Sequence, residues 1–310
     1  MSSQPADRLN VERWTVSAPT SPELPNTAPR NTAEAPSSAM PSAARPVPSA
    51  AHRAYLHALT RERWLIIGVR LALLFGFFAL WEAAARLGWI NAFIVSQPSK
   101  AFEAAAKLAH SGQLLTHLWF TTWETVAGFV LGTALGIALA IGLWWSEFWS
   151  RVLEPYIVVV NSIPKVAIGP IFIVWLGTNP RAIVAMAVAI SFIVTLLMVF
   201  TGFRQVDPNR VKLVKSFGAN KFQVLTKVIL PASVPTMIGA LKVNVGLSFV
   251  GTITGEFLVS SAGLGYLIVY GGQVFNMSLV MSSLLILVAL STILYYLVSA
   301  LEHWITRGWK

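Results

Sequence analysis

The stretch RQVDPNRVKLVKSFGANKFQVLTKVILP occupies residues 204–231 and lies between two segments apolar enough to cross a bilayer. Six of its residues are basic and one is acidic, namely Arg204, Arg210, Lys212, Lys215, Lys221 and Lys227 against Asp207. Short loops rich in Lys and Arg stay on the cytoplasmic side of a membrane. Residues 216–220 interrupt two helical patterns at a single glycine, Gly218. The stretch therefore predicts a cytoplasmic helix, turn and helix between two spans, a shape suited to docking a partner.

The composition of the 310-residue chain indicates a membrane protein. It is 55% hydrophobic and 12% charged, and that charged share is roughly half the average for soluble chains. The net charge of +10 is concentrated in the N-terminal tail and the 204–231 loop. That distribution follows the topology rule for membrane proteins, so nucleic acid is not an expected partner. The absence of Cys excludes disulfides, thiolate metal sites and a Cys nucleophile.

Six segments are long and apolar enough to be helical spans, which need about 20 residues each. They cover approximately residues 66–81, 125–146, 156–177, 182–203, 234–254 and 277–301. The third is interrupted by Pro164, Lys165 and Pro170. Residues 1–60 are expected to form a disordered cytoplasmic tail, because they are rich in Pro, Ala and Ser and lack the apolar run of a core. Six spans starting inside place both termini in the cytoplasm, and the expected fold is an all-α polytopic membrane protein.

The 204–231 loop resembles the cytoplasmic coupling loop of ATP-binding-cassette importer permeases. The pattern of that family is Glu-Ala-Ala, three residues, Gly, nine residues, Ile, one residue and Leu-Pro. Here Gly218 is followed by nine residues and then by Val-Ile-Leu-Pro at 228–231, so the spacing matches. The triplet positions, 212–214, hold Lys-Leu-Val in place of Glu-Ala-Ala. This departure bears on any acid-dependent contact with an ATPase, but not on the shape of the loop.

Other motifs extend the resemblance over about residues 65–301. They are LEPYIVVVNSIPKVAIGPIFIVWLG at 153–177, TGFRQVDP at 201–208 and ALKVNVGLSFVGTITGEFLVSSAGLGYLI at 240–268. Together they are similar to the branch of these permeases associated with nitrate, sulfonate and taurine uptake. The resemblance implies a permease domain over 61–310 with the type I importer architecture. It also implies a multi-pass protein of the cytoplasmic (inner) cell membrane.

The same resemblance implies the partners of the chain. It would be a permease subunit and not an enzyme, forming the path for a small anionic or organic solute. ATP and Mg would bind a separate cytoplasmic ATPase dimer, an external binding protein would deliver the solute, and a second permease copy would complete a homodimer. The chain has no Gly-x4-Gly-Lys-Ser/Thr phosphate loop, so no cofactor is expected on it. Its five histidines form no metal-binding pair, and His110 and His117 are expected at the surface.

The residues expected to couple to the ATPase surround the glycine and the end of the loop. They are Lys212, Lys215, Ser216, Phe217, Gly218, Ala219, Asn220, Leu230 and Pro231. Gly218 would permit a tight turn, and Pro231 would stop the second helix where the fifth span begins. The alternative is a basic loop that only fixes the orientation of the chain.

Two lysines inside spans are candidates for the translocation path. Lys165 follows Asn161 and Ser162 in the broken third span, and Lys242 lies beside Asn244 in the fifth. A lysine deep in a span is costly unless it faces protein or water. We therefore expect both lysines to line the path and favour an anionic solute. The alternative for each is pairing with a backbone carbonyl or snorkelling along a broken helix.

Gly128, Gly132 and Gly136 lie four residues apart on one face of the second span. Small residues at this spacing allow helices to approach closely. Tight packing within one subunit is the favoured interpretation, and packing that also slides during gating is the alternative.

Three carboxylates, Glu82, Glu124 and Glu256, are expected near the outer ends of spans, where charge costs little. The segment after Glu256, which contains Gly263 and Gly265, is expected to fold back as an outer gate or a docking surface for a binding protein. No carboxylate is expected at mid-membrane. The alternative function, an ion-coupled secondary transporter, would usually need one there.

Overall fold

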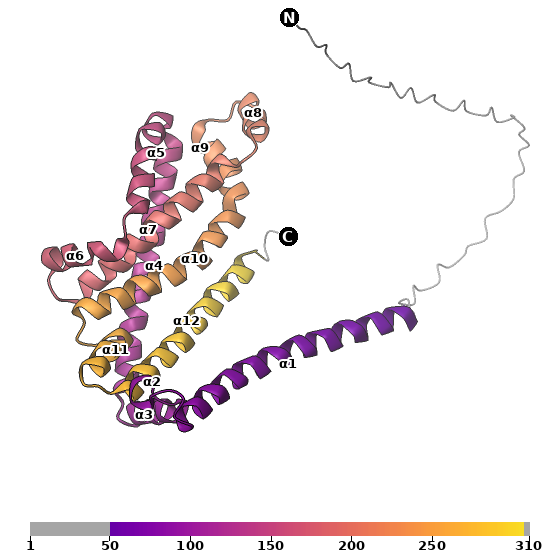
Figure 1. Cartoon of the computed structure of the whole chain (residues 1–310). Helices are drawn as coiled ribbons and strands as arrows, with labels where there is room; N and C mark the ends of the chain where they lie inside the picture. Colours follow the sequence, from indigo (N-terminus) through magenta and orange to yellow (C-terminus); the bar gives the residue numbers. More distant parts are fainter. Residues whose placement is uncertain (1–49, 307–310) are drawn as a thin grey trace, which may run out of the picture. The chain divides into compact units, whose positions relative to one another are not determined.

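A computed structural model describes residues 50–306, and every regular element in that range is helical (Figure 1). The chain divides into two units after Arg63; the start of α1 lies in the first unit, and all elements after α1 belong to the second. Most of the predicted tail lies outside the described residues. Helix α1 (Ala50–Arg86) nevertheless includes residues 50–60, which the sequence placed in the tail. Ala, Leu and Arg favour helix, and a long helix extends cooperatively into such residues.

Five helices in the described range are long and apolar enough to span a membrane, and a bent helix pair makes up to a sixth. The five are the part of α1 from Arg61, α4 (Gln113–Trp145), α7 (Pro180–Arg204), the continuous helix Lys221–Val259 that ends in α10 (Leu230–Val259), and α12 (Met277–Thr306). The predicted all-α polytopic fold of about six spans is confirmed.

The bent pair is the third predicted span. Helix α5 (Glu147–Ser162) is followed by a 3₁₀ turn, η1 (Lys165–Ile168), and then by α6 (Gly169–Leu176), with a bend of 90° between the two halves. Pro164 causes the break, because a residue before proline avoids helical geometry. Ile163 accordingly has an extended backbone, with φ −67° and ψ 131°. The interruption lies where the sequence predicted it.

The centre of the bundle is formed by α7, which packs along both α4 and α10. Helices α8 (Pro208–Ser216) and α9 (Lys221–Val224) lie at one end of this bundle (Figure 1). At the other end lie α2 (Ala92–Val95), α3 (Pro98–His110) and α11 (Leu264–Gln273). The two loop regions that were predicted on opposite sides of the membrane therefore lie at opposite ends of the bundle.

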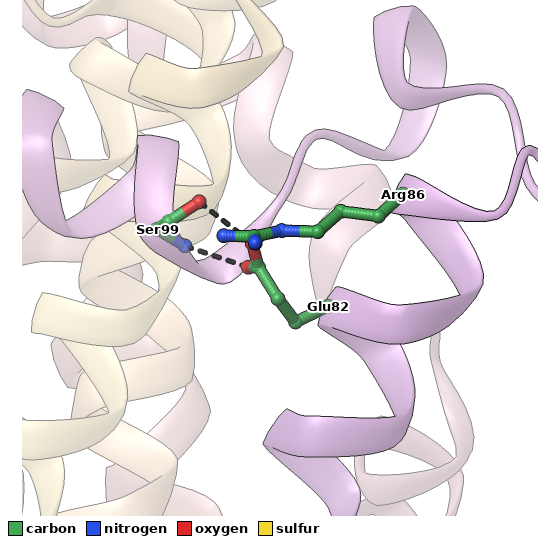
Figure 2. A network of polar contacts seen from close by, with 3 residues as sticks. All are labelled: Glu82, Arg86 and Ser99. Atoms are coloured by element: carbon green, nitrogen blue, oxygen red, sulfur yellow. Dashed lines mark hydrogen bonds and ion pairs between the residues drawn. The ribbon is translucent and has the colours of Figure 1, made fainter.

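Glu82 fixes the end of α1 to the start of α3. Its carboxylate accepts hydrogen bonds from Ser99 N–H (3.0 Å) and Ser99 Oγ–H (2.9 Å), and it pairs with Arg86 Nε at 2.7 Å (Figure 2). A carboxylate is favourable at a helix N-terminus, where backbone N–H groups lack partners. No residue in the most apolar stretch of α1 is buried within the chain, and this polar contact links the end of α1 to α3.

Candidate functional site

The turn between α8 and α9 is a helix-ending motif centred on Gly218. Gly218 N–H donates to Lys215 O (2.9 Å) and Ala219 N–H donates to Val214 O (3.3 Å). This pair of bonds is the Schellman arrangement, which requires a left-handed residue after the helix. Gly218 supplies it with φ +84°. The predicted helix, turn and helix is present, and glycine is the residue that permits the turn.

The start of each short helix is capped by its own side chains. Asn220 Oδ1 accepts from Gln223 N–H (2.8 Å), while Gln223 Oε1 accepts from Asn220 N–H (2.9 Å), which is a reciprocal capping box. Asp207 Oδ1 accepts from Asn209 N–H (2.8 Å) at the start of α8. Asp207, the one acid of the loop, is therefore used as a helix cap.

The inner face of the second helix is buried in the bundle. Val224, Leu225 and Ile229 belong to one apolar cluster with Leu143 of α4 and Phe203 of α7. Burying such a side chain from water stabilises a fold by about 1.5–3 kcal/mol. The inner face of the loop therefore packs against the ends of α4 and α7.

Two polar contacts join this end of the bundle further. Lys221 Nζ donates to Trp145 O and lies over the Trp145 ring at 5.5 Å from its centroid. Arg204 Nη1 pairs with Glu154 Oε1 at 2.9 Å, which links the end of α7 to α5. The partners are 76 and 50 residues apart in the chain, so sequence reasoning did not find them.

The outer face of the loop exposes large apolar side chains among its lysines. Phe217 is 81% exposed, Phe222 62% and Leu213 57%. Beside Phe217 is an open notch of about 340 Å³, lined by Val214, Phe217, Gly218, Ala219, Gln223 and Lys227. Exposed aromatic side chains beside a concave surface are typical of a protein-binding face.

The predicted coupling residues divide between two surfaces. Lys212, Lys215, Ser216, Phe217, Gly218 and Asn220 are exposed, and Ala219 is half-buried in the notch. Leu230 packs against the apolar cluster, and Pro231 is partly buried in the helix that follows. These last two residues lie behind the turn and not on its exposed face.

Pro231 does not stop the second helix, contrary to the prediction. The helix runs without a break from Lys221 to Val259. Residues Leu225–Ile229 form a π turn, η2, and Leu230 N–H donates to Leu225 O. Proline inside an α-helix clashes with the preceding turn and leaves a carbonyl unpaired. The wider π turn accommodates Pro231 without ending the helix.

The candidate path residues of the third span lie together at its break. Asn161 and Ser162 are exposed and Lys165 is half-buried. Lys165 Nζ donates to Asn161 O (2.9 Å) and Oδ1 (3.4 Å). The Asn161 carbonyl is one of the orphan acceptors at a helix C-terminus. The Lys165 ammonium therefore caps the C-terminus of α5, and it lies beside the exposed bend of this span.

The two candidates of the fifth span face different neighbours. Lys242 forms an ion pair with Glu302 of α12 at 2.5 Å and lines a cavity of about 350 Å³ between α10 and α12. Asn244 is 1% exposed and donates to Thr133 Oγ1 of α4 at 2.5 Å. Side chains two residues apart on a helix point in nearly opposite directions. The structure therefore does not place Lys242 and Asn244 on one surface.

The glycines of α4 lie against small residues of α7. A Cβ added to Gly128 would lie 2.3 Å from Ala187 Cβ, and one added to Gly132 would lie 2.0 Å from Ser191 Oγ. Gly136 would meet Thr195 at 2.7 Å. The backbones of α4 and α7 thus approach too closely for a side chain at these positions. The glycines therefore serve tight packing within one subunit.

Two of the three carboxylates are not at a solvated span end, contrary to the prediction. Glu124 and Glu256 are each 1% exposed. His117, predicted at the surface, is partly buried and accepts a hydrogen bond at Nδ1 from Gly263 N–H (3.0 Å). The turn after Glu256 folds back against α4 and buries these groups. Periodicity gives no sign of such a fold-back.

The sequence of the chain is similar to those of known transport permeases. Residues 132–310 match the family described as binding-protein-dependent transport system inner membrane component. The riboflavin transport system permease protein RibX of Chloroflexus aurantiacus is 31% identical over 252 residues, covering 81% of this chain and 94% of that protein. The aliphatic sulfonates transport permease protein SsuC of Escherichia coli is 30% identical, covering 66% and 78%.

Solved structures give the same fold. The inward-facing MetNI methionine ABC transporter matches with a TM-score of 0.54 and 20% identity, covering 63% of this chain and 95% of the matched one. A bacterial ABC transporter for the polysaccharide alginate matches with a TM-score of 0.58 and 14% identity, covering 81% and 99%.

Proposed function

Since the chain belongs to the inner-membrane components of binding-protein-dependent transport systems and is a permease subunit of an ATP-binding-cassette importer, we propose that a separate ATPase subunit binds its 204–231 loop. The observation that carries the proposal is the structure of the loop. Its outer face exposes Phe217 and Phe222, while Val224 and Leu225 anchor its inner face in the bundle. A partner bound to the exposed face of the loop therefore acts directly on α4 and α7.

The proposed mechanism is a switch between two states and involves no chemistry on this chain. ATP binding brings two ATPases together, and each pulls one 204–231 loop. The loop transmits that movement through the cluster around Leu143 and Phe203. Hydrolysis on the partner, which would hold ATP and Mg, resets the path. The permease contributes contacts that differ between two states, which is what allows a ligand to shift a conformational equilibrium.

The assembly we propose contains two copies of this chain, two ATPases and an external solute-binding protein. Both termini lie in the cytoplasm, because the basic loop follows the positive-inside rule. The half-buried Lys165 at the exposed bend favours an anionic solute. Relatives named for riboflavin and for aliphatic sulfonates support the broader class of small organic solutes.

Single cysteines test the proposal cleanly, because the chain contains none. Phe217→Cys carries a thiol-linked photoreactive group on the exposed face of the loop, and it is expected to cross-link to the cognate ATPase. Ser111→Cys is the matched control, because Ser111 is exposed and directly follows α3, which lies at the other end of the bundle. Equal cross-linking from both positions, or none from Phe217→Cys in an active complex, contradicts the docking surface.

The same two variants test the orientation. A membrane-impermeant thiol reagent is expected to label Ser111→Cys in intact cells and Phe217→Cys only in inverted vesicles. Labelling of Phe217→Cys from outside the cell would overturn the cytoplasmic placement of the loop. The solute itself is best found by a thermal-shift screen of the binding protein encoded beside this chain.

A further inference from the structure

Two carboxyl groups meet in the interior at the end of the bundle opposite α8 and α9. Glu124 of α4 and Glu256 of α10 are each 1% exposed. Thr121, one turn before Glu124 on α4, donates to Glu256 Oε1 at 2.7 Å, which places the Glu256 carboxyl against the face of α4 that carries Glu124. Among the described residues, neither takes part in an ion pair. A carboxylate has no hydrogen to donate, so two carboxyl groups form a hydrogen bond only when one of them carries a proton.

Glu256 is already engaged as an acceptor on both of its oxygens. Thr121 Oγ–H donates to Oε1 (2.7 Å) and Gly265 N–H donates to Oε2 (2.5 Å). Thr121 Oγ1 in turn accepts from Leu264 N–H at 2.8 Å. The oxygen Oε2 of Glu124, by contrast, has no protein partner among the described residues. A proton on Glu124 therefore displaces no donor, whereas a proton on Glu256 would compete with one.

The backbone of the turn is shaped around the Glu256 carboxyl. Gly263 has φ +114°, and a Cβ there would lie 2.4 Å from Glu256 Cδ. A Cβ on Gly265 would lie 2.8 Å from Glu256 Cβ. Only glycine at both positions lets the chain pass so close to a side chain. The carboxyl is thus held in a fitted site that connects α10, the start of α11 and α4.

Among the described residues, no Lys, Arg or His of the neighbouring helices forms an ion pair with either carboxyl group. His117 of α4 accepts at Nδ1 from Gly263 N–H (3.0 Å), which assigns the neutral tautomer with its proton on Nε2. The Tyr266 ring of α11 stacks on His117 at 6.0 Å between centroids. From α7, Ile183 packs against Gly255 of α10, while Arg181 lines a groove beside Trp123.

We propose that Glu124 and Glu256 form a proton-binding site, and that the bound proton latches the turn at residues 263–265 to α4. With the proton present, Glu124 donates to Glu256, and the remaining negative charge is shared with Thr121 and the backbone N–H groups. When the proton leaves, two like charges face each other in the interior, which is strongly unfavourable. The turn then separates from α4. This site does not depend on the docking of an ATPase or on the identity of the solute.

Infrared spectroscopy of the full-length protein tests whether the proton is there. The carbonyl stretching band of a protonated carboxylic acid is expected at neutral pH in a detergent free of ester groups, and it shifts in D₂O. The chain has only 13 acidic residues, so the band is traceable. Glu124→Gln should remove it. Glu103→Gln is the matched control, because the exposed Glu103 pairs with Lys107 at 2.8 Å and should leave the band unchanged.

Hydrogen exchange measured by mass spectrometry tests the latch. After correction for the intrinsic pH dependence of exchange, a peptide containing Leu264 and Gly265 should exchange roughly tenfold faster once the proton is lost at alkaline pH. In Glu124→Gln the amide donates to Glu256 in place of the proton, so protection should persist and lose its dependence on pH. The wild-type D₂O measurement needs no variant and decides the matter if Glu124→Gln does not fold.

Three results would overturn the proposal. The first is a wild-type protein with no protonated-carboxyl band at neutral pH, and the second is a band that survives in Glu124→Gln. The third is a Glu124→Gln protein whose turn opens with pH as the wild type does. Loss of ATPase docking without any of these results would leave the proton site intact, so the two proposals fail separately.

Discussion

Lys221, the first residue of α9, is held by Trp145, the last residue of α4: its ammonium donates to the Trp145 carbonyl and lies over the indole at 5.5 Å. A lysine at this position satisfies one of the carbonyls left without a partner at the end of α4. The contact joins the proposed docking loop to a helix that runs the length of the bundle. It is therefore a specific point at which coupling between loop and bundle can be measured.

Lys221→Met removes this contact while keeping most of the length of the side chain. The cation–π interaction and the hydrogen bond together contribute about 1–2 kcal/mol. We expect a modest drop in thermal stability and a larger drop in solute taken up per ATP hydrolysed in reconstituted vesicles. Arg210→Met is the control, because it removes an equal charge from the same loop and Arg210 has no side-chain partner among the described residues. Equal losses in the two variants would show that only charge matters.

Gly218→Ala isolates the conformational requirement of the turn. Nothing in the described structure lies within 4 Å of a Cβ at this position, so no clash is added. The left-handed backbone, φ +84°, costs a non-glycine residue about 1–2 kcal/mol. Thermal unfolding of the purified chain should report this loss. Gly218→Asn should recover part of it, because asparagine tolerates left-handed geometry, and an alanine variant as stable as wild type would contradict the turn.

Gly128→Ala tests how tightly α4 and α7 pack. The added methyl would meet Ala187 Cβ at 2.3 Å, and relieving such overpacking costs about 1–3 kcal/mol. Gly142→Ala lies on the same helix with nothing within 4 Å of its Cβ, and it should be neutral or slightly stabilising because alanine favours helix. Detergent-solubilised melting curves compare the pair directly. If both variants melt alike, close packing at Gly128 does not limit stability.

Local features of the fold were predictable because they depend on neighbours in sequence. The span lengths, the break at Pro164 and the turn at Gly218 each follow from the chemistry of a few adjacent residues. The close spacing of Gly128 and Gly132 likewise predicted packing. Pro231 was misjudged, since the effect of a proline depends on whether the preceding turn can widen, and residues 225–229 form that wider π turn.

The burial of Glu124 and Glu256 could not be predicted from sequence. The sequence placed both carboxylates near the outer ends of spans, where solvation is the ordinary expectation. Only the fold-back of the turn after Glu256, seen in the bond from Gly265 N–H, removes them from water. The contacts of Lys242 and Lys221 were missed for the same reason, because their partners lie on helices distant in sequence.

Lys165 carries the sharpest test of the path. Its ammonium is bonded to Asn161 O at 2.9 Å, so capping of the broken helix and attraction of a solute are separable roles. Lys165→Arg keeps a charge and a donor, and it should retain most uptake of an anionic solute. Lys165→Met loses both, and uptake should fall at least tenfold, because a desolvated charge contact is worth about 1.5–3 kcal/mol.

Thermal stability of Lys165→Met, measured alongside uptake, separates the two roles. If Lys165 only caps α5, its replacement by Met should lower the melting temperature and leave uptake per folded molecule unchanged. Uptake unaffected by Lys165→Met would remove this residue from the path.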